Sequence, residues 1–295
     1  MPNRSEHQPN RPPAAIFLHI HRTAGTTLHR IIERQYPPEE IHFLQGDDGH
    51  AAIEKFKALS EDQRSKIRML KGHMAFGLHE FIPGPSFYFT VLRDPIERVI
   101  SSYHFALRTP SHYLYDIVTS GGMNLEAFLD SKIPVMLNDA QVRMISGVWG
   151  EPGFGECDRG TLELAKKNLR EHFKVVGLSE RFDETLYLLK ETLNWQNSIK
   201  YKRHNVTQNR PAKRDFTPRA LDAVRQANQL DIELYDFAKT LFREQVRRQG
   251  SLFGLRVKAF QLGQLLDHTL VPLYWRAREI SVRTLVRDWA RRRQH

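Results

Sequence analysis

The chain lacks several features that secreted and membrane-spanning proteins need. Its single cysteine, Cys157, cannot form an internal disulfide, so nothing in the sequence requires an oxidising compartment. It contains no apolar run of about eighteen residues, which argues against a membrane-spanning helix. Residues 1–13 are polar and proline-rich, without the apolar centre of a signal peptide. We therefore expect a disordered lead-in over 1–13 and a cytoplasmic protein, either free or peripheral to a membrane.

The positive charge of the chain is unevenly spread. Forty-four Lys and Arg against 34 Asp and Glu leave a net charge of +10. Residues 276–295 carry seven arginines against two carboxylates, a net charge of +5. No aromatic stacking motif or zinc spacing accompanies this charge, so we do not expect nucleic-acid binding. Residues 246–295 are predicted to form a basic amphipathic extension, which could pack on the rest of the chain, form an oligomer contact or lie on an anionic membrane.

The most informative stretch is Ile16 to Leu28, IFLHIHRTAGTTL. An alternating apolar run predicts a strand, small and hydroxyl residues predict a turn, and the sequence from Leu28 to Tyr36 predicts a helix. Such a turn lets backbone N–H groups approach an anion, and the helix N-terminus adds positive potential there. A phosphate-like ligand is therefore expected, although an ordinary α/β turn remains equally open on shape alone. The Gly-Lys-Ser/Thr ending of an ATP-type loop is missing, because Thr26 and Thr27 follow Gly25.

The segment HIHRTAGTTL resembles the 5′-phosphosulfate loop of sulfotransferases that use 3′-phosphoadenosine 5′-phosphosulfate (PAPS), in particular the group that includes heparan sulfate 2-O-sulfotransferase. That loop reads roughly P-K-T-A-[GS]-T-[ST], so this chain has His21 for proline and Arg22 for lysine. The resemblance implies that Arg22 also has a catalytic role, stabilising charge on the leaving phosphate. The residues implied to bind the 5′ end of the nucleotide are Arg22, Thr23, Ala24, Gly25, Thr26 and Thr27.

A second candidate residue, His73, follows a strand-like pattern over 67–70. Strand ends of this kind usually supply catalytic groups in open α/β sheets, but a histidine here could also be an ordinary loop residue. GHMAFGL resembles the family's Gly-His segment, which implies that His73 is the general base. In the 2-O group a second histidine precedes that glycine, where this chain has Lys71. Because residues two apart share a strand face, we expect Lys71 to lower the pKa of His73.

The most specific stretch begins with a buried-looking strand over Phe87 to Leu92. Asp94 then caps a predicted helix over 95–107, opened by a proline. RDPIERVISSYHFALR resembles the family's 3′-phosphate motif, R-D-P-x-x-R-x-x-S. The resemblance implies that Arg93 and Ser101 bind the nucleotide's 3′-phosphate, and arginine suits a dianion because it makes paired, charge-assisted hydrogen bonds.

Three further polar groupings stand out, and two of them keep more than one interpretation. Asp94 and Arg98 are predicted to form a helix-surface ion pair. NDAQVRMISG, residues 138–147, resembles a family segment that either binds the acceptor or makes hydrogen bonds at the edge of the core. The stretch 197–217 is either a solvated loop or a basic loop that closes over the nucleotide or meets an anionic acceptor. Its cations are Lys200, Lys202, Arg203, Arg210, Lys213 and Arg214.

The order of the expected elements predicts an α/β fold with a central, mainly parallel β-sheet flanked by helices, and with one nucleotide site at its strand ends. This sulfotransferase domain is expected over 14–245, followed by a helical C-terminal extension. The remaining expected elements are a helix over 51–59, a second helix capped by residues 60–63, and a strand over 174–178. Further helices are expected over 125–129, 161–173, 180–193, 217–230 and 231–245.

The resemblance implies that the protein moves a sulfuryl group from PAPS to an acceptor hydroxyl, on a carbohydrate, with His73 taking the proton. No metal is expected, because no His, Cys and carboxylate cluster shows ligand spacing. Two alternatives stay open. One is a phosphate-loop kinase of a small molecule, weakened by the missing Lys-Ser/Thr. The other is a non-catalytic polyanion or membrane-surface binder, favoured by the departures at Arg22 and Lys71.

Overall fold

The structure is a computed structural model that describes residues 12–44, 49–148, 152–202 and 213–266. Two compact units divide between Arg248 and Gln249. The predicted lead-in before residue 12 and the arginine-rich segment 276–295 lie outside the described residues. No helix in the described part of the chain is both long and apolar enough to cross a bilayer.

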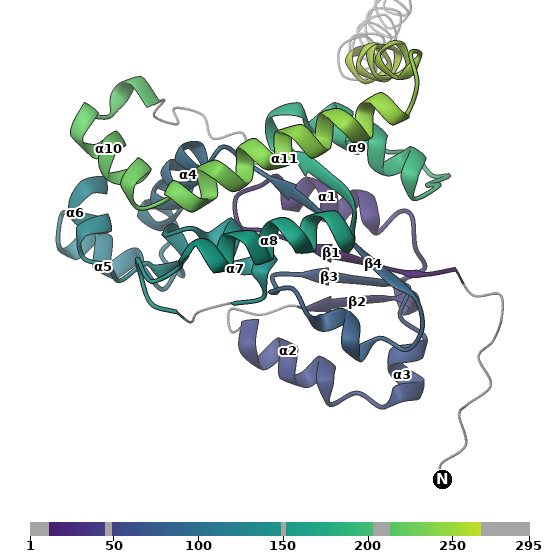
Figure 1. The fold of residues 1–295 in the computed structure, drawn as a ribbon, viewed down its shortest axis with the longest axis horizontal. Helices are drawn as coiled ribbons and strands as arrows, with labels where there is room; N and C mark the ends of the chain where they lie inside the picture. Colours follow the sequence, from purple (N-terminus) through teal and green to yellow (C-terminus); the bar gives the residue numbers. More distant parts are fainter. Residues whose placement is uncertain (1–11, 45–48, 149–151, 203–212, 267–295) are drawn as a thin grey trace, which may run out of the picture. The chain divides into compact units, whose positions relative to one another are not determined.

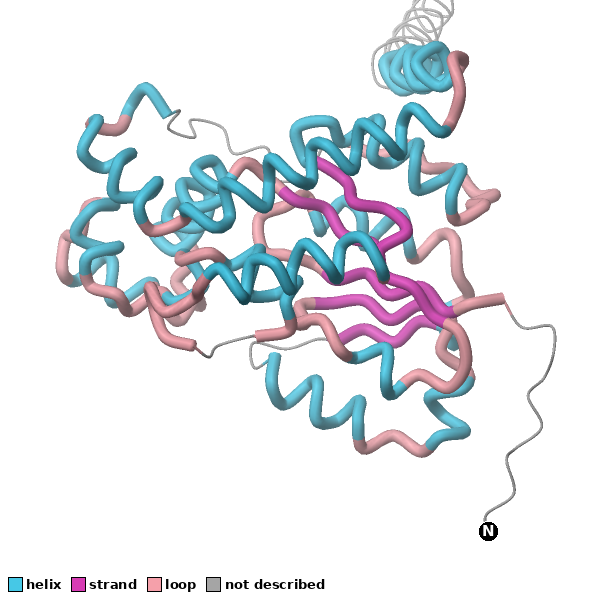
Figure 2. Tube along the Cα trace, in the orientation of Figure 1, coloured by secondary structure: helices cyan, strands magenta, loops and turns pink. Residues whose placement is uncertain are grey.

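A single five-stranded sheet lies at the centre of the first unit (Figure 2). Its strand order is β2-β3-β1-β4-β5, and every neighbouring pair is parallel, which confirms the predicted fold class. The strands are β1 (Ala14–Leu18), β2 (Ile41–Leu44), β3 (Met69–Gly72), β4 (Ser86–Leu92) and β5 (Phe173–Leu178). After β1, the next two strands along the chain, β2 and β3, lie on one side of β1, and β4 and β5 lie on the other side. The carboxyl ends of β1, β3 and β4 therefore meet where the strand order reverses, the usual ligand position in such sheets.

Strand β1 explains why the opening stretch of the sequence is so apolar. It pairs with β3 on one side and β4 on the other, and all five of its residues are buried. A parallel strand covered on both faces reads as a continuous apolar run. The strand was predicted to begin at Ile16, but the ladder begins at Ala14 and stops at Leu18, where the chain turns toward α1. The short edge strand β2 was not predicted.

Helices connect and cover the strands (Figure 1). They are α1 (Gly25–Ile32), α2 (Gly49–Lys57), α3 (Glu61–Ser65), α4 (Pro95–Arg108), α5 (Tyr115–Ser120), α6 (Leu125–Asp130), α7 (Ala140–Ser146), α8 (Arg159–Glu171), α9 (Phe182–Thr192), α10 (Pro218–Gln226) and α11 (Gln229–Arg248). Short 3₁₀ turns lie at Pro38–Glu40, Leu78–Phe81, Val135–Leu137, Ser179–Arg181 and Lys213–Asp215. The described part of the second unit contains a helix over 253–266, as predicted for the extension.

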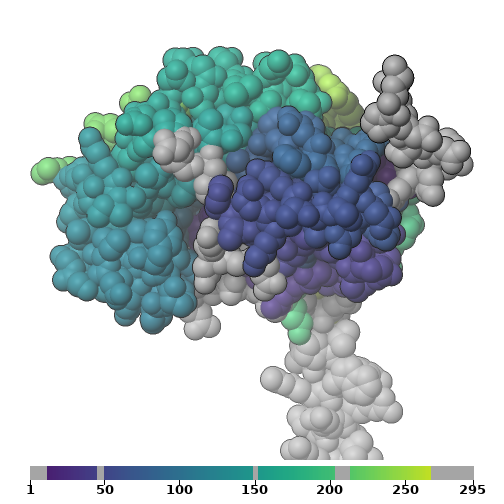
Figure 3. Space-filling model, turned by 90° about the horizontal axis from the view of Figure 1, so that it is seen from below, coloured from purple at the N-terminus to yellow at the C-terminus, as the bar shows by residue number. Residues whose placement is uncertain are grey.

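The helices form two groups within the first unit. Helices α8, α9 and α11 contact the edge strand β5. Helices α4, α5, α6 and α10 share a separate apolar cluster that includes Tyr103, Phe128 and Val224, and Figure 1 shows α5, α6 and α10 together at one side of the sheet. In the view from below, α2 and α3 form the dark blue surface turned to the viewer (Figure 3).

Two predicted caps are confirmed, and two predicted boundaries are wrong. Ser60 and Gln63 form a capping box at α3, and the Asp94 side chain accepts from the N–H of Glu97 at the start of α4. Helix α1 begins at Gly25, three residues before the expected Leu28. Helix α10 ends at Gln226 because the Asn228 side chain turns back to the Val224 carbonyl at 3.1 Å. Helices α5 and α7 were not predicted.

Candidate active site

The loop between β1 and α1 holds a strained backbone. Arg22 and Ala24 have φ values of 69° and 66°, in the left-handed region that side chains disfavour. The buried Thr23 hydroxyl donates to the Ile20 carbonyl at 2.7 Å and stabilises the turn. Strain of this kind persists only where neighbouring contacts hold it, and it concentrates at functional sites.

The N-terminus of α1 suits an anion. The first helical bond runs from the Leu28 N–H to the Ala24 carbonyl at 3.3 Å, so the earlier N–H groups point out of the helix end. The first turn carries no acidic residue, and no side chain among the described residues caps it. The helix dipole adds positive potential at the same place. Ala24 and Thr26 are exposed there, whereas Thr27 is buried.

Arg22, Arg93 and Ser101 come together from three segments. The Arg22 Nε donates to the Ser101 Oγ at 3.1 Å, and the Arg22 guanidinium lies over the Phe105 ring, 4.5 Å from its centroid. The Arg93 Nη1 donates to the Arg22 carbonyl at 3.0 Å. The sequence assigned Arg22 to the 5′ end of the nucleotide and the other two residues to the 3′-phosphate. The structure joins all three in one cationic cluster, and their roles toward a ligand stay predictions.

Gly25 is required for packing as well as for the turn. A Cβ added at Gly25 would lie 1.7 Å from the His19 Nε2 and 2.1 Å from the His19 Cε1. The sequence explained this glycine by the close approach of an anion. The structure shows that the His19 ring fills the space beside it.

His73 lies in a stack of imidazole rings. Its ring is parallel to that of His21, with centroids 3.6 Å apart and an interplanar angle of 6°, and it stacks on His19 at 4.2 Å and 26°. The His29 Nε2 is 3.0 Å from the His19 Nδ1. We call His19, His21, His29 and His73 the histidine stack. The sequence did not predict the three partners of His73, although the i, i+2 spacing of His19 and His21 at a strand end was a usable signal.

Burial favours the neutral form of the imidazoles in the histidine stack. It is the main cause that lowers the pKa of His73, and it holds the pKa values of His19 and His21 well below their usual range. Burial, with the charge of Lys71, lowers the pKa of His29 to about 3. The His73 Nδ1 is 2.8 Å from the His19 carbonyl, which can only accept, so Nδ1 carries the proton. The Nε2 of His73 is therefore the basic nitrogen.

Lys71 does not act on His73 as expected. Its Nζ lies 2.5 Å from the Glu33 Oε1 and 4.8 Å from the centroid of the Phe43 ring. Its charge lowers the pKa of His29 instead. Gly72, with a φ of 146°, separates Lys71 from His73 and ends the regular alternation of strand faces. The prediction that Lys71 lowers the pKa of His73 is therefore wrong in this structure.

The predicted surface ion pair between Asp94 and Arg98 is also wrong. Arg98 is fully buried, and its Nη2 lies 3.7 Å from the Asp231 Oδ2 on α11. Its Nη1 donates to the Met136 carbonyl at 3.1 Å. Asp94 instead caps α4 and accepts from the Lys213 Nζ at 3.2 Å. A salt bridge inside the molecule replaces the expected one on its surface.

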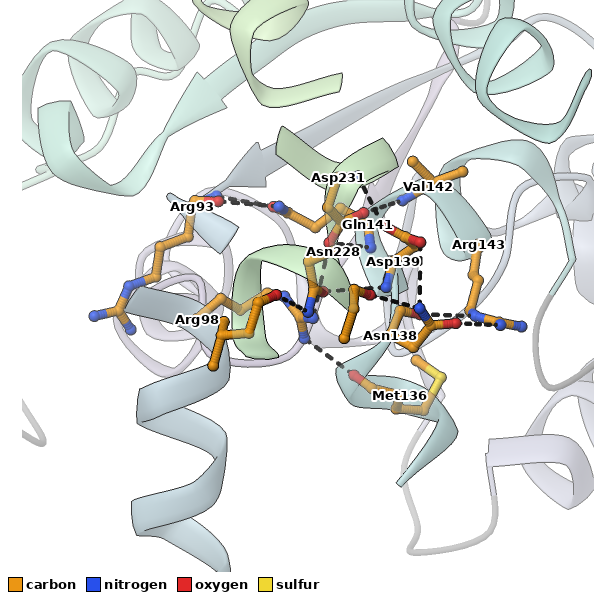
Figure 4. Close-up of polar contacts among 12 residues, drawn as sticks. Arg93, Arg98, Met136, Asn138, Asp139, Gln141, Val142, Arg143, Asn228 and Asp231 are labelled. Atoms are coloured by element: carbon orange, nitrogen blue, oxygen red, sulfur yellow. Dashed lines mark hydrogen bonds and ion pairs between the residues drawn. The ribbon is translucent and has the colours of Figure 1, made fainter. Parts of the chain in front are cut away.

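The segment around α7 makes core hydrogen bonds (Figure 4). Asn138, Gln141 and Arg143 are at most 2% exposed. Arg143 donates to the Asn138 carbonyl at 2.8 Å and to the Asn138 Oδ1 at 2.9 Å. Gln141 pairs with the backbone of Arg93. These contacts favour the core interpretation of this segment over direct acceptor binding.

The basic stretch 197–217 is attached close to the predicted motifs at both described ends. Arg34, just after α1, donates to the carbonyls of Ser198 and Lys200 at 3.1 and 2.7 Å. At the other end, the Lys213 side chain meets Asp94 at the N-terminus of α4. Two of its predicted cations, Arg203 and Arg210, lie outside the described residues.

Comparison with known proteins identifies relatives along most of the chain. A family model described as galactose-3-O-sulfotransferase matches residues 1–258. Galactose-3-O-sulfotransferase 2 of Homo sapiens is 25% identical over 278 residues, which cover 85% of this chain and 67% of the relative. Heparan-sulfate 6-O-sulfotransferase 1-B of Danio rerio is 29% identical over 284 residues, 80% of this chain and 68% of the relative. A solved mouse sulfotransferase complexed with PAP shows 15% identity and a TM-score of 0.36, covering 85% of this chain and 90% of that one.

Proposed function

The chain belongs to the galactose-3-O-sulfotransferase family, and we propose that it moves a sulfuryl group from PAPS to a carbohydrate hydroxyl at the site around the β1–α1 loop. Membership makes it a carbohydrate sulfotransferase, the class of enzyme that the sequence predicted. The observation that carries the assignment of the site is the convergence of Arg22, Arg93 and Ser101 beside the N-terminus of α1.

The cationic cluster is suited to the nucleotide's phosphates. Arg93 and Ser101 would hold the 3′-phosphate, since guanidinium and hydroxyl groups donate to its oxygens. The uncapped N–H groups at the start of α1 would hold the 5′ end. Arg22 would stabilise the charge that develops on the leaving phosphate. Donors already fixed in place need little reorganisation during the reaction.

His73 would supply the base. The acceptor oxygen forms a bond to sulfur, the bond between sulfur and the 5′-phosphate oxygen breaks, and the hydroxyl proton passes to the His73 Nε2. The histidine stack supports this role because burial lowers the pKa of His73 and the His19 carbonyl fixes its tautomer. The base should therefore stay available below pH 7.

We propose a glycan as the acceptor, because the relatives are named for galactose and heparan sulfate. The finer resemblance to the 2-O type and the expected absence of a metal stay predictions. The kinase alternative is weakened by the lack of a lysine after Gly25. A thermal-shift comparison of Mg-ATP with 3′,5′-adenosine bisphosphate separates the two chemistries, and an acceptor screen with labelled PAPS separates an enzyme from a binding protein.

Calorimetry tests the assignment of the nucleotide site. The protein should bind 3′,5′-adenosine bisphosphate about ten- to a hundred-fold more tightly than 5′-AMP, because a charge-assisted contact contributes about 1.5 to 3 kcal/mol. Arg93→Ala should remove most of that preference. Arg170→Ala is the control, since Arg170 is exposed on α8, where it lies over the Phe237 ring. Equal affinity of the unmodified protein for both nucleotides would rule the site out.

A further inference from the structure

We propose that Gln141 is a positioning residue for the nucleotide site, and that it sets the direction of the Arg93 guanidinium through the Arg93 backbone. Gln141 lies on α7, and neither the sequence motifs nor the family resemblance assigns it this task. The inference rests on the proposed function, since it concerns the residue expected to hold the 3′-phosphate.

The Gln141 amide makes two hydrogen bonds to one residue. The Arg93 N–H donates to the Gln141 Oε1 at 2.9 Å, and the Gln141 Nε2 donates to the Arg93 carbonyl at 3.0 Å. This reciprocal pair resembles a hydrogen-bonded pair between strands. The ladder between β4 and β5 ends at Leu92, so Gln141 extends the constraint to the next residue. Figure 4 shows the side chain reaching from α7 to Arg93.

Gln141 is itself held rigidly by a crossed cap between α7 and α11. The Asp231 carboxylate accepts from the N–H groups of Gln141 at 3.2 Å and Val142 at 2.8 Å, at the start of α7. The Asp139 Oδ1 accepts from the Asp231 N–H at 2.9 Å, in the first turn of α11. Each helix N-terminus is thus capped by an aspartate from the other. Because the backbone of Gln141 is fixed by this cap, its side-chain amide can hold the backbone of Arg93 in one position.

The same carboxylate also positions the second predicted 3′-phosphate contact. Asp231 faces Arg98 of α4, and Ser101 lies about one turn further along that helix. Asp231 therefore helps to fix the positions of Arg93 and Ser101. It acts on Arg93 through Gln141 and on Ser101 through Arg98 of the same helix. We call Arg98, Asp139, Gln141 and Asp231 the carboxylate network. Its geometry fixes the separation of the two groups that would hold one phosphate, a separation that must be kept within about 0.5 Å.

Burial supports a positioning role for Gln141. The residue is completely buried, and a buried amide is costly unless its hydrogen bonds are made. An apolar side chain would fill the same space without that cost. One hydrogen bond that the Gln141 side chain donates and one that it accepts go to the residue that the sequence places on the 3′-phosphate. The amide therefore orients Arg93 in addition to filling the core.

The test compares two nucleotides. Gln141→Glu keeps the side-chain shape but turns a carboxylate oxygen toward the Arg93 carbonyl, and Gln141→Met removes both hydrogen bonds. By calorimetry, each variant should bind 3′,5′-adenosine bisphosphate roughly tenfold more weakly, with a smaller loss for 5′-AMP, because Arg93 is expected to contact the 3′-phosphate directly and the 5′ loop only through the Arg22 carbonyl. The ratio of the two affinities isolates positioning from general destabilisation. Gln141→Met decides the question if Gln141→Glu fails to fold.

Asn168→Asp is the matched control. Asn168 is another buried amide, and its Nδ2 donates to the Ile145 carbonyl at 2.9 Å near the other end of α7. This change should lower the melting temperature and leave the nucleotide ratio unchanged. If the Gln141 variants fold and keep the ratio of the unmodified protein, the positioning role is overturned. If the unmodified protein shows no preference for the bisphosphate, the proposed function fails first and this inference fails with it.

Discussion

The carboxylate network is buried and the histidine stack is buried at His19 and partly buried at its other members, and the two clusters use their polar atoms differently. In the carboxylate network, Gln141 and Asp231 bond backbone N–H and carbonyl groups and so fix the positions of main-chain segments. In the histidine stack, most contacts are between ring faces, and the Nδ1 atoms of His21 and His29 have no hydrogen-bond partner among the described residues. The first arrangement suits positioning, whereas in the second the hydrogen bond from the His73 Nδ1 to the His19 carbonyl leaves Nε2 as the basic nitrogen of His73.

Burial also shifts the pKa values of the two clusters in opposite directions. Both kinds of group are pushed toward their neutral form, which means a lowered pKa for an imidazole and a raised pKa for a carboxyl group. Burial and the neighbouring Asp231 raise the pKa of Asp139 to about 7, and burial raises that of Asp231. Acid therefore adds charge to the histidine stack and removes charge from the carboxylate network.

The largest effect should come from removing the base. With an acceptor found by the PAPS screen, His73→Ala should lower kcat by about a hundred- to ten-thousand-fold, the usual loss for a general base. Affinity for 3′,5′-adenosine bisphosphate should change little, because the cationic cluster does not include His73. The rising limb of the kcat/KM profile against pH should disappear, since only neutral imidazole accepts the proton.

His42→Ala is the control for that experiment, because His42 lies on β2 and packs on Phe56. It should keep full activity. If His73→Ala also kept full activity, the base would lie elsewhere. The histidine stack would then be a packing device, and the contrast with the carboxylate network would disappear.

Local motifs explain which parts of the site were predictable. Arg93, Asp94 and Ser101 lie within one strand-to-helix connection, so capping rules and helical spacing place them correctly. The histidine stack depends on the pairing of Leu18 with Gly72 in neighbouring strands, which aligns His19 with His73. Strand order and register follow from the whole core, and spacing along the chain carries little information about them.

The same reason explains the error at Arg98. Helical spacing pairs it with Asp94, and the sequence alone contains no sign that α11 brings Asp231 against it. The Asn228 side chain, which ends α10 by donating to the Val224 carbonyl, is likewise held by a distant residue, since its Oδ1 accepts from the Asp139 N–H. Predictions from sequence failed where a polar side chain was buried by an element far along the chain.

An effect of intermediate size is expected on stability in acid, where the two clusters should change the free energy of unfolding in opposite directions. The pKa of His29 falls from about 6.5 in the unfolded chain to about 3 in the folded one. Between these values the unfolded chain binds more protons, so the free energy of unfolding decreases as the pH is lowered, by up to about 1.4 kcal/mol per pH unit. The pKa of Asp139 rises from about 4 to about 7, so the folded chain binds more protons and this group adds stability as pH falls from 7 to 4.

Urea unfolding between about pH 7.5 and 5.5 measures both contributions. His29→Phe keeps a ring but removes the titrating group, so its stability should fall less on acidification than that of the unmodified protein. Asp139→Asn mimics the neutral carboxyl group at every pH, so its stability should fall more. Identical pH slopes for the two variants would contradict the opposite responses of the clusters.

The smallest effect is expected at Lys71, which lies next to the histidine stack without belonging to it. Lys71→Met keeps a buried apolar stem and removes a charge that acts on His29 and is balanced by Glu33. Glu33 is 52% exposed, so water can solvate it after the change, and replacing a buried ion by an apolar side chain is often neutral or stabilising. The rising limb of the kcat/KM profile should move by less than about 0.3 pH unit, because burial dominates the lowered pKa of His73. An upward shift of about one unit would show that the charge of Lys71 reaches His73, as the strand pattern alone had indicated.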